Sequence, residues 1–148
     1  MKPIRVLFLC IHNSARSQMA EAYLKHFGGN RFEVESAGLE AGKLNPLAVQ
    51  VMLEEGIDIS KNETNCVDDF FAEGRRYSYV ITVCDAGNAD KCPLFPGVHA
   101  KINWNFTDPS SLSGSLEDRL TTTRIVRNQI KAAILEFIKS IPGDELKH

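Results

Sequence analysis

A cysteine and an arginine, Cys10 and Arg16, are separated by five residues near the start of the chain. They follow an apolar run, residues 6–9, and precede a helical pattern, so the stretch between them is predicted to join a strand to a helix. Such a loop turns backbone N–H groups and a helix N-terminus toward a tetrahedral oxyanion, and an arginine adds a planar, bidentate anchor. Positive potential favours the thiolate form of a cysteine, which is the nucleophilic form. The spacing therefore predicts a Cys10 thiolate that attacks a phosphate-like anion.

The loop itself is predicted to hold the anion. Its residues are Ile11, His12, Asn13, Ser14, Ala15 and Arg16. The hydroxyl of Ser17 is a candidate donor to the Cys10 thiolate, and the alternative is a first-turn serine that faces water. We expect no catalytic role for the His12 side chain, because loop amides already stabilise the thiolate. The competing interpretation is a core cysteine beside a surface arginine, which the strand–loop–helix context disfavours.

Two further cysteines, Cys84 and Cys92, stand eight positions apart. Closing a loop of this size costs little entropy, so a reversible disulfide is feasible if the segment bends. Zinc sites favour two residues between paired cysteines, and this spacing does not match them. The plain alternative is two unrelated cysteines. A fourth cysteine, Cys66, stands among apolar residues and is expected to pack as a small hydrophobic side chain.

Asp108, which precedes Pro109, follows the last predicted strand. Attack of a thiolate on an oxyanion expels an oxygen leaving group that needs a proton, and a carboxylic acid can supply it. The alternative is an Asp-Pro pair that only begins a turn. Because the Cys10 loop is predicted at the same edge of the sheet, we predict that Asp108 is the catalytic acid.

Strands and helices alternate along the chain. The predicted strands are residues 4–9, 32–37, 79–83 and a stretch around 98–102, and the predicted helices are 14–27, 46–55, 66–73 and 116–138. This order predicts a parallel sheet with helices on both faces. Ligands of such folds bind beyond the carboxyl ends of the strands. Cys10 and Cys84 each follow directly on a strand, so both thiols are expected at that edge.

The composition is that of a globular protein, with 148 residues of which 43% are hydrophobic and 24% charged. We expect one catalytic domain, residues 1–148. The net charge of −2 gives no indication of nucleic-acid binding, and no apolar run is long enough to span a membrane. The first residues do not resemble a signal peptide, so we expect a cytoplasmic protein. In that compartment, cysteines favour catalysis or redox exchange over a structural disulfide framework.

Together these features resemble the thioredoxin-coupled arsenate reductases, which share the fold of the low-molecular-weight tyrosine phosphatases. The matching stretches cover nearly the whole chain and are residues 8–10, 13–14, 16–21, 36–38, 45–46, 56–60, 90–93 and 104–109. The resemblance implies an α/β fold of three layers, in which a four-stranded parallel sheet of flavodoxin-like order carries helices on both faces.

Tyrosine phosphatases of this fold differ from the chain at three places. They have proline where the chain has Gln18, and aromatic residues follow their Asp-Pro pair where the chain has Ser110 and Ser111. They also need no pair like Cys84 and Cys92. These differences favour a reductase, and the alternatives are a tyrosine phosphatase and a non-catalytic redox or metal sensor.

The resemblance also implies a mechanism and a partner. Arsenate binds in the loop, the Cys10 thiolate attacks arsenic, and Asp108 protonates the departing oxygen. Cys84 then attacks the sulfur of Cys10 and arsenite leaves. Cys92 next attacks Cys84, and a thioredoxin-like thiol reductant reduces the Cys84–Cys92 disulfide. No tightly bound cofactor is expected.

Some members of the family bind potassium through four side chains. The corresponding positions here are Asn13, Glu21, Ser36 and, where those members have an aspartate, Asn65. One ligand charge is therefore missing in this chain, which disfavours a cation at these residues.

Overall fold

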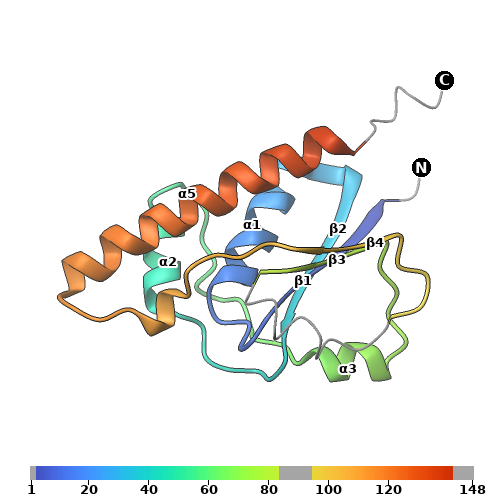
Figure 1. Cartoon of the computed structure of the whole chain (residues 1–148), viewed down its shortest axis with the longest axis horizontal. Helices are drawn as coiled ribbons and strands as arrows, with labels where there is room; N and C mark the ends of the chain where they lie inside the picture. Colours follow the sequence, from blue (N-terminus) through green and yellow to red (C-terminus); the bar gives the residue numbers. More distant parts are fainter. Residues whose placement is uncertain (1–2, 84–94, 142–148) are drawn as a thin grey trace.

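A four-stranded parallel sheet forms the centre of the structure, a computed structural model that describes residues 3–83 and 95–141. The strands are β1 (Ile4–Cys10), β2 (Phe32–Gly38), β3 (Tyr79–Thr82) and β4 (Ala100–Asn103). Their order across the sheet is β2-β1-β3-β4 (Figure 1). The predicted sheet is thereby confirmed. The predicted site residues Cys84 and Cys92 lie outside the described ranges.

Helices cover both faces of this sheet, as predicted. The longer elements are α1 (Arg16–Gly28), α2 (Pro46–Leu53), α3 (Val67–Ala72) and α5 (Leu116–Ser140), and two short 3₁₀ turns are η1 (Gly29–Arg31) and η2 (Pro109–Ser111). Figure 1 shows α1, α2 and α5 on one face and α3 on the other. The β1–α1 connection and the chain that follows β4 lie at the same end of the sheet, where the site is built.

β1 is the strand on which the site depends. Its side chains alternate between two cores: Val6, Phe8 and Cys10 belong to the core that includes α1 and α5, whereas Leu7 and Leu9 belong to the core that includes α3. A strand covered on both faces has an almost continuous apolar sequence, which is why residues 6–9 could be identified as a strand. The burial of both faces fixes the position of Cys10 at the strand end.

The helix termini explain how the connecting loops enter the site. Asn45 caps α2, because its side-chain oxygen accepts a hydrogen bond from the N–H of Leu47 at 2.8 Å, and Pro46 occupies the first helical position. α1 begins at Arg16 rather than at Ser14. Asn13 has a φ of 55°, in the left-handed region, so the chain is still in the loop at that point.

Cys66 lies at the N-terminal end of α3, half-buried, rather than inside the core. Its backbone forms a parallel bridge with Gly38, and its thiol points to the carbonyl oxygen of Leu39 at 3.6 Å. The helix that follows is shorter than predicted and begins one residue later, because Cys66 has an extended backbone.

Polar contacts behind the loop fix α1 against the other helices of its face. The hydroxyl of the fully buried Tyr23 donates to Glu55 at 3.0 Å, and the Lys131 ammonium donates to the same carboxylate at 3.0 Å. The hydrogen bond from Lys131 lowers the pKa of Glu55, although partial burial opposes it. Burial, together with the same contact to Glu55, raises the pKa of Tyr23.

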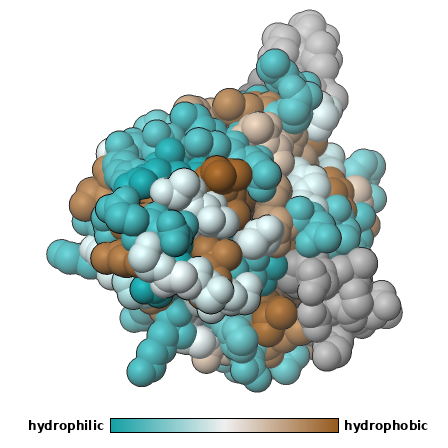
Figure 2. Space-filling model, turned by 60° about the vertical axis from the view of Figure 1, so that its left-hand side comes forward, coloured by the Kyte–Doolittle hydropathy of each residue, from teal (hydrophilic) through white to brown (hydrophobic). Residues whose placement is uncertain are grey.

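The surface of the protein carries both apolar and polar side chains. Large apolar side chains are exposed at scattered positions such as Leu53, which is 58% exposed, and Leu116, which is 55% exposed. In the view of Figure 2, brown hydrophobic residues stand among teal hydrophilic ones. Among the described residues, none of the helices combines the length and the apolar character that crossing a membrane requires.

Candidate active site

Cys10 ends β1 with its thiol almost completely buried, at 2% exposure. The Asn13 N–H donates to its sulfur at 3.1 Å, and the Ser17 hydroxyl oxygen lies 2.9 Å from that sulfur. The neighbouring β2 residue is Gly38, where an added Cβ would lie 2.6 Å from the Asn13 nitrogen. The absence of a side chain there lets the loop close over the sulfur.

The orientation of the Ser17 hydroxyl follows from its neighbour. The Asn13 side-chain nitrogen donates to the Ser17 oxygen at 2.8 Å, so the hydroxyl hydrogen of Ser17 is free to point at the sulfur of Cys10. A thiolate at Cys10 would then receive two hydrogen bonds, one from a backbone amide and one from a hydroxyl. The predicted contact between Ser17 and the cysteine is present.

Asn13 anchors the loop with every hydrogen-bonding group of its side chain. Its nitrogen also donates to the Ser36 hydroxyl at 2.9 Å, while its oxygen accepts from the Asn65 N–H at 2.9 Å and from Gln18 at 3.3 Å. The residue is fully buried. Asparagine tolerates a left-handed backbone better than other non-glycine residues, so one residue supplies both the turn and the anchor.

Gln18 is a site residue that the sequence reasoning did not assign. It is 1% exposed, and its side-chain nitrogen donates to the carbonyl oxygens of Asn13 at 3.1 Å and Glu63 at 3.0 Å. Its side-chain oxygen accepts from Asn62 at 3.1 Å. Gln18 thus ties the loop to residues 62–63. The available signal was its position, where phosphatases of this fold have a proline that cannot make these bonds.

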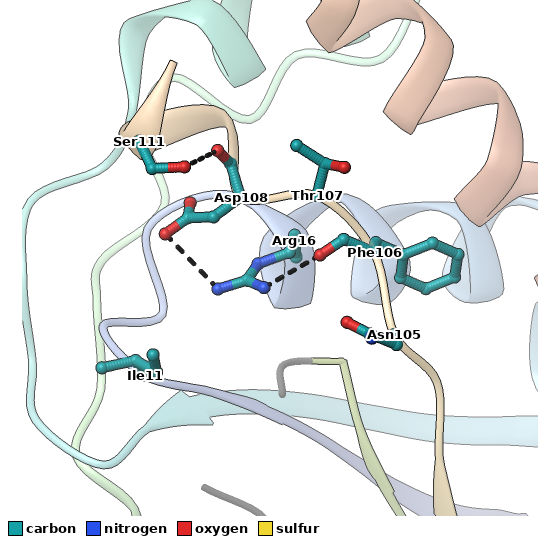
Figure 3. A pocket seen from close by; sticks show the side chains of 7 residues that line it. All are labelled: Ile11, Arg16, Asn105, Phe106, Thr107, Asp108 and Ser111. Atoms are coloured by element: carbon teal, nitrogen blue, oxygen red, sulfur yellow. Dashed lines mark hydrogen bonds and ion pairs between the residues drawn. The ribbon is translucent and has the colours of Figure 1, made fainter. Parts of the chain in front are cut away.

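Arg16 and Asp108 face one another across a pocket (Figure 3). The Arg16 side chain is 5% exposed, and its two terminal nitrogens go to different partners: Nη1 donates to the Phe106 carbonyl oxygen at 3.1 Å, and Nη2 lies 3.5 Å from Asp108 Oδ2. The other carboxylate oxygen of Asp108 accepts from the Ser110 N–H at 2.9 Å. The pocket has a volume of about 480 Å³ and is lined by Ile11, Arg16, Asn105, Phe106, Thr107, Asp108 and Ser111.

The His12 side chain is not among those that line this pocket. Its ring nitrogen Nε2 lies 3.1 Å from the exposed Glu40 carboxylate, and its carbonyl oxygen accepts from the Gly42 N–H at 2.9 Å. The side chain is 47% exposed. The absence of a catalytic role for this imidazole stays a prediction.

The four residues considered for potassium do lie together, but their oxygens are already engaged. The Asn65 side-chain nitrogen donates to the Ser36 carbonyl oxygen at 3.1 Å. The Ser36 hydroxyl donates a hydrogen bond to one Glu21 oxygen and accepts one from the Asn13 side chain. The second Glu21 oxygen accepts a hydrogen bond from the Lys25 ammonium at 2.6 Å. N–H groups therefore occupy the places that a cation would need, and the residues present do not fit a potassium ion. Within the described ranges, no group of three His, Cys, Asp or Glu residues could hold a metal.

Comparison with known proteins agrees with this geometry. The family model of the low molecular weight phosphotyrosine protein phosphatases matches residues 5–144. An arsenate reductase of Shouchella clausii is 41% identical over 135 residues, which cover 91% of this chain and 95% of that protein.

Solved structures that are similar to this chain also include arsenate reductases. One described as an arsenate reductase in the phosphate binding state has a TM-score of 0.77 and 33% identity, covering 94% of this chain and 99% of that chain. A thioredoxin-dependent arsenate reductase of Corynebacterium glutamicum has a TM-score of 0.69 and 32% identity, covering 100% of this chain and 64% of that chain. The chain therefore belongs to the low molecular weight phosphotyrosine protein phosphatase family and, within it, to the arsenate reductases.

Proposed function

We propose that this chain reduces arsenate to arsenite with Cys10 as nucleophile and Cys84 and Cys92 as a thiol relay. The observation that carries the proposal is the pair of hydrogen-bond donors on the Cys10 sulfur, in the same loop whose Arg16 faces Asp108 across the pocket. This arrangement places two hydrogen-bond donors on the sulfur of the proposed nucleophile, and it sets a bidentate anion ligand beside a carboxyl group that can act as the acid. The sequence similarity of the chain to an arsenate reductase favours arsenate as the anion.

The first step is substitution at arsenic. The Cys10 thiolate forms a sulfur–arsenic bond, the bond from arsenic to one of its hydroxyl groups breaks, and Asp108 gives its proton to that departing hydroxyl, which leaves as water. Arg16 compensates the negative charge of the remaining oxygens through two N–H groups. Arsenic is still in its +5 state at this stage.

The second step transfers electrons. The Cys84 thiolate attacks the Cys10 sulfur, and the sulfur–arsenic bond breaks with its electron pair on arsenic, so arsenite is released in the +3 state. The two thiols have become a disulfide. Cys92 then attacks Cys84 by thiol–disulfide exchange, which frees Cys10 and leaves a Cys84–Cys92 disulfide. We assign its reduction to a thioredoxin-like protein in the cytoplasm, where such reductants keep thiols reduced.

A coupled assay tests the function directly. Arsenate, thioredoxin, thioredoxin reductase and NADPH should give continuous NADPH oxidation, and a parallel assay should measure hydrolysis of phosphotyrosine. Hydrolysis without arsenate reduction would establish the phosphatase alternative that the family name suggests.

Cys92→Ala separates the relay from simple hydrolysis. We expect one turnover of arsenate followed by arrest as a Cys10–Cys84 disulfide, because no internal thiol remains to reopen it. Mass spectrometry after one round should identify that disulfide. Cys66→Ala is the matched control and should turn over continuously, since the relay does not use this thiol. Wild-type rates in Cys92→Ala with thioredoxin would contradict the relay.

We also propose that the chain works without a bound potassium ion, since the Asn65 amide and the Lys25 ammonium already bind the oxygens of Ser36 and Glu21. Exchange of potassium for sodium at constant ionic strength should change neither the thermal midpoint nor the turnover of the wild type. Asn65→Asp should be destabilised by roughly 1–3 kcal/mol in sodium, because its carboxylate faces the Ser36 carbonyl without a shared hydrogen.

The measurement is thermal unfolding of each variant in the two salts. In Asn65→Asp, potassium should recover part of the lost stability. Asn128→Asp on α5 adds the same charge elsewhere and should respond equally to both salts. A wild-type midpoint that rises with potassium alone would contradict the proposal.

A further inference from the structure

Asn45 links three segments around the pocket and is itself 8% exposed. Its backbone N–H donates to the Ser14 carbonyl oxygen of the anion loop at 2.8 Å. Its side-chain oxygen caps α2 through Leu47, and its side-chain nitrogen donates to the Ser110 hydroxyl oxygen at 2.9 Å. A helix cap requires only the oxygen, and serine caps a helix about as well as asparagine. The nitrogen of Asn45 therefore serves the contact with Ser110.

Ser110 lies in η2 and contacts the Asp108 carboxyl group through its backbone. Its backbone N–H donates to Asp108 Oδ1 at 2.9 Å, and the intervening Pro109 is buried. The bond from Asn45 to Ser110 therefore fixes the turn that carries the acid relative to the loop that carries the anion. These partners are 65 positions apart in the sequence.

The second link between the same two segments is Arg16, and substrate must weaken it. Its Nη1 and Nη2 groups now face the Phe106 carbonyl and the Asp108 carboxylate. An oxyanion in the loop takes up the same N–H groups, because a bidentate arginine uses its terminal nitrogens. The Asn45–Ser110 bond involves no group that the anion needs, so it persists when Arg16 turns to the substrate.

We propose that Asn45, acting through Ser110, is a positioning residue that holds Asp108 over the bound oxyanion during the chemical step. This inference rests on the proposed function, since it assigns the acid of that reaction its support. Small displacements of a catalytic group from its productive geometry can lower rates by about 10²-fold, so the loss of this support affects the chemical step more than binding.

The test is the single-turnover rate of arsenate consumption in four variants. Ser110→Ala removes the acceptor, and Asn45→Ser keeps the cap of α2 but cannot reach Ser110; both should slow by roughly 10- to 100-fold. Ser110→Thr keeps a hydroxyl and should recover most of the rate. Ser115→Ala removes a hydroxyl that caps α5 and is not among the hydrogen-bond partners of the Asn45 side chain, and it should match the wild type.

Two further readouts separate positioning from general damage. Inorganic phosphate should bind Ser110→Ala with wild-type affinity. This binding can be monitored by the fluorescence of Trp104, the single tryptophan, whose ring lies 6.3 Å from that of the pocket residue Phe106. Introducing Ser110→Ala into Asp108→Asn should cause no additional loss, because the acid through which Ser110 acts is already absent.

A wild-type rate in Ser110→Ala, or a full further loss in the Asp108→Asn background, would overturn the inference while leaving the proposed function intact. If the wild type consumes no arsenate but hydrolyses aryl phosphates, the proposed function fails by itself. The same variants are then compared on phenyl phosphate and 4-nitrophenyl phosphate. The slowing should be larger for phenyl phosphate, whose leaving group needs a proton more, and equal slowing would overturn the inference. A wild type with neither activity would overturn both.

Discussion

Cys10→Ser should lose arsenate reduction and any phosphate-ester hydrolysis, by roughly 10⁴-fold or more. The two donors that would stabilise a thiolate at Cys10, the Asn13 N–H and the Ser17 hydroxyl, stay in place in this variant. They cannot compensate, because a serine hydroxyl keeps its proton near neutral pH and no base lies within hydrogen-bonding distance of the sulfur among the contacts described. The fold should persist, since serine is close to cysteine in shape.

The measurement is arsenate consumption in a single turnover, together with phosphate binding followed by Trp104 fluorescence. Binding should remain while chemistry stops. Cys66→Ser makes the same chemical change at the start of α3 and should retain full activity. More than a trace of turnover in Cys10→Ser would remove this residue as the nucleophile.

Arg16→Lys should reduce kcat/KM by about 10²–10³-fold although the charge is conserved. In the free protein, the two terminal nitrogens of Arg16 reach separate partners, Phe106 and Asp108, which shows that the guanidinium can engage two oxygens at once. A lysine ammonium is a single point charge and cannot bind two anion oxygens in a fork.

Both kcat and KM should be affected, because the lost hydrogen bond acts on the bound anion and on the charge that develops in the transition state. Arg124→Lys provides the comparison, because Arg124 also contacts two oxygens at once, those of the Glu54 carboxylate on the surface, but lies outside the pocket. It should leave turnover unchanged. Near-normal constants in Arg16→Lys would mean that the loop does not use the arginine as an anion ligand.

The parts of the fold that were predictable are those with local causes. The apolar β1 run and the Asn45–Pro46 cap each lie within a few residues, and each was identified correctly. α1 begins two residues later than the sequence predicts, because the left-handed turn at Asn13 depends on Gly38, Ser36 and Asn65, which come later in the sequence.

The residues of the site can likewise be divided into those that the sequence predicts and those that it does not. The identity of the Cys10 loop and of Asp108 followed from residue types at strand ends, and their approach was inferred from the topology of a parallel sheet. The supporting hydrogen bonds were not predictable, because Gln18 and Ser110 find their partners through tertiary packing. Polar residues with no local partner, buried beside a predicted site, are the signal that could have identified them.

The contact between Arg16 and Asp108 also sets a threshold for selectivity. An incoming anion must compete with the Asp108 carboxylate for the Arg16 guanidinium. Weakly basic monoanions such as chloride or nitrate therefore gain little binding free energy when they enter the pocket. A tetrahedral dianion offers more charge and more oxygens than Asp108 and can displace it. Phosphate passes this threshold as readily as arsenate. The discrimination between the two must therefore come after binding, at the electron-transfer step, because arsenic accepts the electron pair of a breaking sulfur bond far more readily than phosphorus does.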